Sequence, residues 1–230
     1  MKASQRPVAS ALRRRHEVTW LAAGVIAAAI AMSAGSARAE SNFVNGSGTA
    51  TAHLNFSIVI PKFLYLQVGT GTYPTSVNTV DTILFDMTGA ISSIGNATPQ
   101  AGTGGDLTGG AVTARVVGNN FNAAVNLSAS TVGAMSNGAG NTISWSEISV
   151  TSAALAVVPA AASTLNHPGT AAAPFADGAA TTVSLTPVGK VINQSAKWTF
   201  QYKNSNVPSA GTYGNTVANN GQVTYTITMP

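Results

Sequence analysis

The sequence predicts an all-β fold, an antiparallel β-sandwich, with a closed barrel as the alternative architecture. Apolar and polar residues alternate with a period of two in one segment after another, which is typical of half-buried strands. Asn and Gly mark turns between these segments, and Thr, which favours pleated surfaces, is abundant. Roughly nine or ten strands separated by turn residues are expected, as in a sandwich of two sheets.

The first 39 residues are expected to be a signal peptide. Residues 1–19 carry five positive charges, residues 20–32 form an apolar run, and Ala37-Arg38-Ala39 supplies an A-x-A cleavage site. At about 1.5 Å per residue, a helix of that run is too short for a hydrocarbon core of about 30 Å. We therefore predict an exported chain without a transmembrane span after cleavage, extracellular or at the cell surface, with the periplasm as the alternative.

Charge is sparse and balanced beyond the signal peptide. Residues 40–230 contain five Lys and Arg against six Asp and Glu, which gives a net charge of −1. Nucleic-acid-binding proteins need a dense basic face, so that class is excluded. The lack of cysteine excludes disulfide-stapled folds and Cys-ligated zinc. A flexible leader is expected over residues 40–49 and a single β-sandwich domain over residues 50–230.

Each expected strand follows from an alternating segment. The first is expected where apolar residues at 54, 56, 58 and 60 face away from polar residues at 53, 55 and 57. Further strands are expected over residues 63–68, 83–87, 112–116, 124–127, 143–145, 149–158, 181–185, 197–203 and 223–229. The turn Gly118-Asn119-Asn120 predicts a hairpin between the strands over 112–116 and 124–127.

The residues suited to catalysis or metal binding are few and scattered. His53 and His167 are expected to be solvent-exposed, the first on a strand and the second in a loop, and zinc needs three or four ligands. The chain is therefore predicted to be no enzyme and to need no cofactor. Two alternatives stay open: a calcium site made of loop acids, and a hydrolase in which Glu147 works with a second carboxylate at roughly 5–10 Å.

The aromatic residues divide into two groups. Trp145 and Trp198 occupy apolar positions of alternating segments and are expected in the core. Tyr73 and Tyr213 lie in predicted loops beside Gly and Thr, so they are candidate ligand-binding residues. They support an alternative function, a secreted carbohydrate-binding module that contacts a glycan through its loop aromatics.

The C-terminal region resembles the final strands of exported bacterial proteins. The residues that carry the similarity are Lys197-Trp198-Thr199-Phe200-Gln201-Tyr202, Ala210-Gly211-Thr212-Tyr213 and Gly221-Gln222-Val223-Thr224-Tyr225-Thr226-Ile227. They look like the terminal hairpin of fimbrial-type and surface-attached β-sandwich proteins. The resemblance implies an immunoglobulin-like sandwich, an extracellular location, a structural or adhesive role and, for chaperone–usher pilus subunits, exchange of strands. The chain differs from pilus subunits in having no cysteine for their disulfide, so no functional residue is transferred.

Together these observations predict an exported, non-enzymatic structural or adhesive surface protein, with a fimbrial-type subunit as the specific form. The expected partners are further copies of the chain or other surface proteins, because little charge repulsion opposes association. The last strand is the expected assembly edge, since it ends the chain. Its apolar residues are Val223, Tyr225, Ile227 and Met229.

Overall fold

The computed structural model describes residues 41–229, which form an all-β fold with almost no helix. The expected signal peptide and residue 40 of the expected leader lie outside this range. Within it, no helix combines the length and the hydropathy that crossing a bilayer requires. The elements in chain order are β1 (Leu64–Val68), β2 (Ile83–Leu84), η1 (Thr88–Ser93), β3 (Gln100–Ala101), β4 (Thr103–Gly104), β5 (Ala111–Asn119), β6 (Val125–Ser130), β7 (Met135–Ser136), β8 (Thr142–Ile143), η2 (Trp145–Glu147), β9 (Ile148–Ala153), β10 (Ser163–Thr164), β11 (Ala180–Leu185), β12 (Val191–Tyr202) and β13 (Thr224–Ile227).

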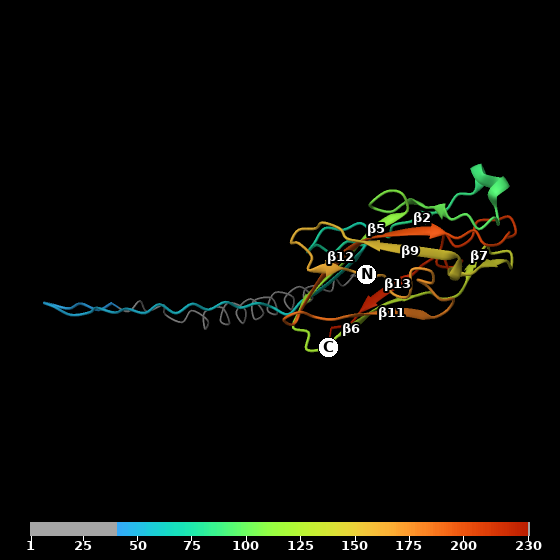
Figure 1. Ribbon diagram of the computed structural model, residues 1–230. Helices are drawn as coiled ribbons and strands as arrows, with labels where there is room; N and C mark the ends of the chain where they lie inside the picture. Colours follow the sequence, from blue (N-terminus) through green and yellow to red (C-terminus); the bar gives the residue numbers. More distant parts are fainter. Residues whose placement is uncertain (1–40, 230) are drawn as a thin grey trace, which may run out of the picture. The chain divides into compact units, whose positions relative to one another are not determined.

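The longer strands build two main sheets (Figure 1). In the larger sheet, β5 lies between β1 and β12, and β12 also pairs with β3, β9 and β10. These pairings are antiparallel except for the short parallel pair of β10 with β12. The smaller sheet has the antiparallel order β11-β6-β13.

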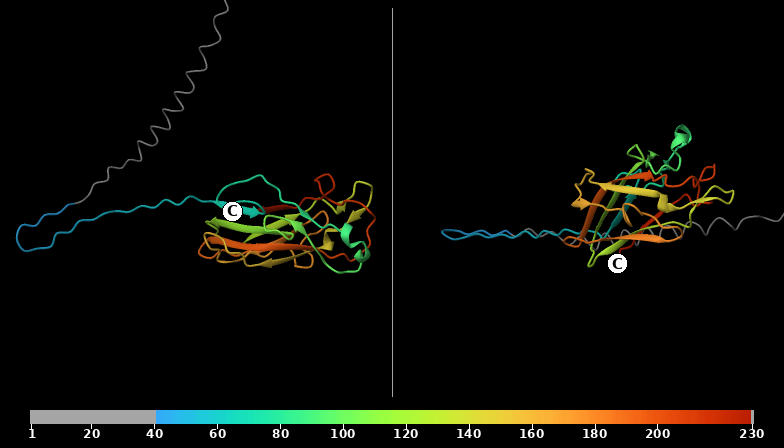
Figure 2. Two further views of the ribbon diagram at one scale, coloured as in Figure 1. Left: turned by 90° about the horizontal axis from the view of Figure 1, so that it is seen from above. Right: turned by 45° about the vertical axis from the view of Figure 1, so that its right-hand side comes forward.

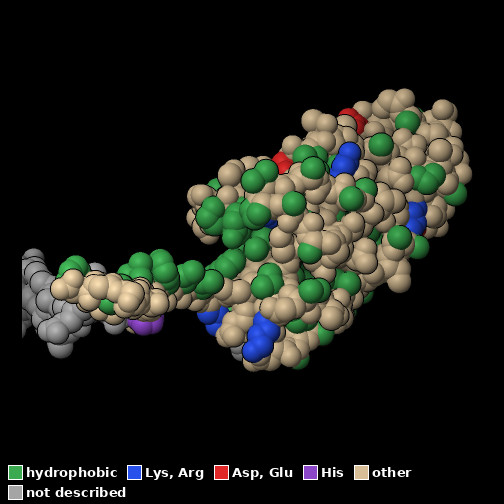
Figure 3. Space-filling view, turned by 60° about the vertical axis from the view of Figure 1, so that its left-hand side comes forward, with side chains coloured by type: hydrophobic (Ala, Val, Ile, Leu, Met, Phe, Trp, Pro, Cys, Tyr) green, Lys and Arg blue, Asp and Glu red, His purple; other side chains and the backbone are tan. Residues whose placement is uncertain are grey.

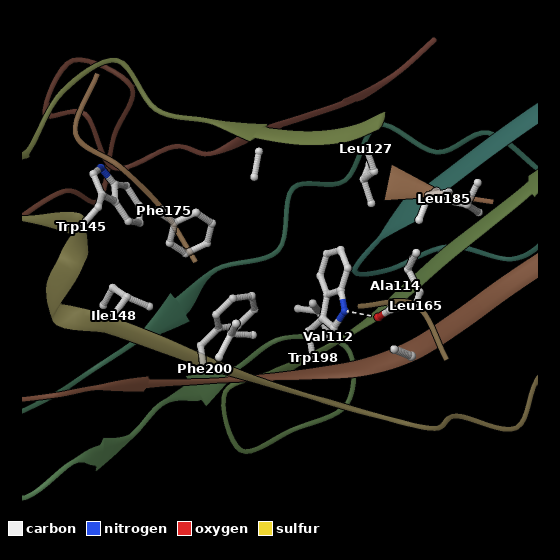
Figure 4. Packing of buried hydrophobic residues seen from close by; sticks show 14 of the residues in the cluster. Val112, Ala114, Leu127, Trp145, Ile148, Leu165, Phe175, Leu185, Trp198 and Phe200 are labelled. Atoms are coloured by element: carbon white, nitrogen blue, oxygen red, sulfur yellow. Dashed lines mark hydrogen bonds between the residues drawn. The ribbon is translucent and has the colours of Figure 1, made fainter. Parts of the chain in front are cut away.

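Side chains from both sheets share one hydrophobic core (Figure 4). Val112, Ala114 and Val116 point into it from β5, and Leu127 points into it from β6. Trp198 of β12 lies among them, and its Nε1 donates a hydrogen bond to the Leu165 carbonyl oxygen at 2.8 Å. Both tryptophans predicted for the core, Trp145 and Trp198, are buried, so that prediction is confirmed.

Most expected strands are present, with changed lengths. The segments expected over 63–68, 112–116, 149–158, 181–185, 197–203 and 223–229 overlap with β1, β5, β9, β11, β12 and β13. The segment over 83–87 shortens to β2, and the segment over 143–145 ends in η2. Residues 41–229 contain thirteen strands, of which six have only two residues. The expected number, nine or ten, lies between the seven longer strands and the total of thirteen.

The predicted hairpin between residues 112 and 127 is wrong. β5 belongs to the larger sheet and β6 to the smaller one, so the chain crosses between sheets after Asn120. Gly118 leaves room for the buried Phe121 ring at this crossing, because a Cβ at Gly118 would lie 2.8 Å from Phe121 Cε2. β12 and β13 also lie in different sheets, so the terminal hairpin implied by the resemblance is not formed.

Residues 50–60, here called the arm, differ most from expectation. The predicted strand over residues 54–60 is wrong, because the arm forms no strand and pairs with no strand of the described chain. Its alternating apolar side chains are exposed: Leu54 by 69%, Phe56 by 87%, Ile58 by 85% and Ile60 by 73%. Figure 2 shows the segment as extended chain, and Figure 3 shows hydrophobic side chains gathered along one side of it.

Candidate functional site

The strand β13 forms one edge of the smaller sheet. It pairs with β6 in register, from Thr224 opposite Ser130 to Ile227 opposite Leu127, and with no other strand of residues 41–229. The expected alternation is present, since Val223, Tyr225, Ile227 and Met229 are partly buried while Thr224, Thr226 and Thr228 are exposed. The four apolar side chains pack against the core, but they remain less covered than the buried core residues of β5 and β6. The backbone N–H and C=O groups on the other side of β13 therefore form no ladder hydrogen bonds within residues 41–229.

The side chain of Tyr225 connects this edge to a buried histidine. His167 Nδ1 lies 2.5 Å from the Pro168 carbonyl oxygen, and Nε2 lies 2.9 Å from the Tyr225 hydroxyl. A carbonyl oxygen can only accept, so Nδ1 carries the proton and Nε2 accepts from Tyr225. The rings of Phe175, Trp198 and Phe200 surround the imidazole at centroid distances of 4.6–5.7 Å.

The expectation of an exposed His167 is therefore wrong, because the residue is only 4% exposed. Burial lowers the pKa of His167 to about 4, and the hydrogen bond to Pro168 offsets part of that effect. Burial also raises the pKa of Tyr225, whose hydroxyl reaches inward although its residue is partly exposed. Both side chains are therefore neutral at pH 7, and the pair forms a hydrogen-bonded brace beneath β13.

The candidate ligand residue Tyr73 is half-buried and lies against a charged side chain. The Arg115 guanidinium carbon is 4.6 Å from the centroid of the Tyr73 ring. On another side, the Tyr65 ring meets Tyr73 edge to face at 5.1 Å. Tyr73 and Arg115 line a surface recess of about 290 Å³.

The second candidate, Tyr213, is not part of that recess. It is half-buried in the loop before β13, and its hydroxyl donates to the Ser209 carbonyl oxygen at 2.7 Å. The adjacent Gly211 approaches the Asn137 side chain, since a Cβ there would lie 3.1 Å from Asn137 Nδ2. Tyr213 thus holds its own loop together and forms no joint aromatic platform with Tyr73.

The acidic side chains of residues 41–229 all accept hydrogen bonds from backbone N–H groups. The acceptor and donor pairs are Asp81 with Thr70, Asp86 with Thr88, Asp106 with Thr113, Glu147 with Ser205, and Asp177 with Trp145. For Asp86 the hydrogen bonds from the Thr88 backbone and side chain lower the pKa of the carboxyl group. Each carboxylate thus braces a loop, and the described residues contain no cluster of three His, Asp or Glu suited to a metal ion.

Sequence reasoning did not single out Arg115, although one signal was present. It is the only arginine after residue 38, and it stands between Ala114 and Val116 in the middle of an apolar strand. A charged residue at such a position needs a local reason.

Comparison of the chain with protein-family models, curated proteins and solved structures finds no match.

Proposed function

We propose that this chain is an exported structural subunit, of fimbrial type, that assembles by adding the arm of one copy to the β13 edge of the next. In this proposal the two sheets are the layers of an immunoglobulin-like sandwich that lacks one edge strand. The observation that carries it is the exposed arm, an alternating apolar segment with no partner strand in the described chain. The apolar run over residues 20–32 and the A-x-A site at residues 37–39 support export.

The arm and the edge match in pattern and length. The arm has apolar residues at 54, 56, 58 and 60, and the β13 segment has them at 223, 225, 227 and 229. Because strand side chains alternate between faces, an arm strand beside β13 places its four apolar residues on the core side. There they cover the partly buried Tyr225 and Ile227, while the polar side chains of the arm face water.

The energetic argument favours such pairing. Full burial of an apolar side chain of this size contributes about 1.5–3 kcal/mol, and four of them in the arm are exposed. New main-chain hydrogen bonds between the arm and the β13 edge would add to the affinity, as in other cases of strand addition. The surface adds little repulsion, since charged side chains are sparse on the face shown in Figure 3.

The test uses two variants of the exported protein that change opposite faces of the arm. Ile58→Asp places a charge on the apolar face, whereas the control Ser57→Asp places the same charge on the polar face. We expect multimers or fibres from the parent protein and from Ser57→Asp, and monomers from Ile58→Asp, by light scattering and negative-stain microscopy. Ile58 is 85% exposed, so its substitution leaves the folded monomer as stable as before. A parent protein that is strictly monomeric, or an Ile58→Asp variant that assembles equally well, would refute the proposal.

A peptide with the sequence of residues 51–62 gives an independent test. It is expected to occupy the β13 edge and to terminate assembly, whereas the same peptide with Asp at position 58 does not. Protease treatment of whole cells then tests location, because surface display exposes the chain to cleavage and periplasmic residence protects it.

A further inference from the structure

The outer face of the larger sheet holds a buried cation. Ala114 and Val116 point into the core, so Arg115 between them points to the opposite face. Arg115 is nevertheless only 3% exposed, because the segment over 155–159 and the turn that carries Tyr73 cover it. Two neighbours in the strand register, Gln67 and Ser195, are buried as well.

Arg115 has no counter-ion among the residues from 41 to 229. Nη1 donates to the Val158 carbonyl oxygen at 3.1 Å, and Nη2 donates to the Pro159 carbonyl oxygen at 2.9 Å. Nε is buried and its hydrogen finds no acceptor. The acids of residues 41–229 are used elsewhere as loop braces, and none forms an ion pair with this guanidinium.

This arrangement is costly for a site with only a structural role. Taking a cation out of water costs several kcal/mol, and two neutral carbonyls with one aromatic face offset part of that cost. Arginine presents parallel N–H donors that match the two oxygens of a carboxylate, and here Nε keeps its donor free. An anion that enters the recess would offset the charge of the guanidinium group, because Arg115 lines the recess.

The recess beside Arg115 limits the size and polarity of that anion. Its volume of about 290 Å³ is just below the usual range for small-molecule sites, about 300–1,000 Å³. Polar residues Gln67, Thr72 and Thr113 line it together with apolar Leu155 and Val157. This mixture suits a single sugar ring, which has hydroxyl groups at its rim and apolar C–H groups on its faces.

We propose that the Arg115 recess binds one acidic monosaccharide, a uronic acid unit, with the sugar carboxylate on the guanidinium and the ring beside Tyr73. The site would give the proposed structural subunit a second property, recognition of an acidic glycan. It does not depend on the arm or on assembly. Of the two tyrosines considered for glycan contact, it uses Tyr73 and not Tyr213.

The test follows the Arg115 Nε–H group directly by ¹H–¹⁵N NMR of the purified protein. The cross-peak is identified by its absence in Arg115→Lys. Glucuronate is expected to shift it in a saturable manner, while glucose and sodium acetate at equal concentration and ionic strength do not. Loss of a charged hydrogen bond predicts a roughly 10- to 100-fold weaker affinity for Arg115→Lys by calorimetry. The control Lys190→Gln removes a positive charge from outside the recess and is expected to bind as the parent does.

Three results would overturn the proposal. One is an Nε–H signal that glucuronate leaves unchanged. Another is an equal shift with acetate, which would show a simple carboxylate site without sugar recognition. The third is an unchanged affinity of Arg115→Lys in a protein whose thermal unfolding matches the parent. Because the Ile58→Asp monomer retains the recess, binding by that variant separates this proposal from the one on assembly.

Discussion

Acidification is expected to destabilise this protein through the buried imidazole of His167. The folded state keeps the ring neutral, with Nδ1 donating to the Pro168 carbonyl and Nε2 accepting from the Tyr225 hydroxyl. Protonation would add a second N–H donor at Nε2 and a positive charge among the rings of Phe175, Trp198 and Phe200. In the unfolded chain the His167 imidazole is in water, so it binds the proton at its ordinary pKa of 6.5.

The size and sign of the effect follow from the two pKa values. Burial lowers the pKa of His167 from 6.5 to about 4 in the folded state. Between these values the unfolded state binds one proton more than the folded state, so the free energy of unfolding decreases as the pH falls. At about 1.36 kcal/mol for each pH unit, the interval from 6.5 to about 4 corresponds to roughly 3 kcal/mol. The loss begins below pH 6.5 and is complete below pH 4.

Urea unfolding followed by tryptophan fluorescence at a series of pH values measures this slope. We expect His167→Gln, whose amide does not titrate, to lose the slope between pH 5 and 6.5. The control His53→Gln removes an exposed imidazole from the arm and is expected to keep it. Identical slopes in the parent and His167→Gln would refute the argument.

Four further substitutions test the fold. Gly109→Ala and Gly110→Ala both place a side chain at positive φ, which costs roughly 1–2 kcal/mol. At Gly110 the new Cβ would also lie 2.7 Å from Gly102 Cα, whereas Gly109 has open space, so we expect the larger decrease in Tm for Gly110→Ala. Trp198→Phe removes the donor to a buried carbonyl and part of the core, and we expect a loss of about 2–4 kcal/mol in denaturant unfolding. Asp177→Ala leaves the Trp145 backbone N–H without its acceptor, and we expect a loss of about 1 kcal/mol in the same assay.

The strand pattern was predictable because alternation reports directly which residues face a core. β12 and β13 are present where Trp198 to Tyr202 and Val223 to Met229 alternate with polar residues. Pairing was less predictable. The turn at Asn119 and Asn120 indicates that the chain changes direction, but it does not say which sheet the next strand joins. The arm shows the same limit, since its alternation identifies a strand-forming segment without saying that its partner lies in the same chain.

The buried polar residues were also hard to predict. Pro168 and Gly169 indicated an exposed loop around His167. Leu165 and Phe175 of the same segment are nevertheless buried, and the His167 side chain is buried together with them. Local composition describes the backbone of a loop and not the surface onto which it folds. Arg115 was overlooked because its strand neighbours are apolar, although that contrast was itself the signal.

The separation of sequence neighbours between sheets has a consequence for folding kinetics. Pairing in both sheets joins residues that are distant in the chain, as for Ser128 and Thr226, which are 98 positions apart. Such a high contact order places the protein among slow folders, with times of roughly milliseconds to seconds. Because β13 follows every other strand of residues 41–229 along the chain, the smaller sheet cannot be completed until residue 227 has been synthesised.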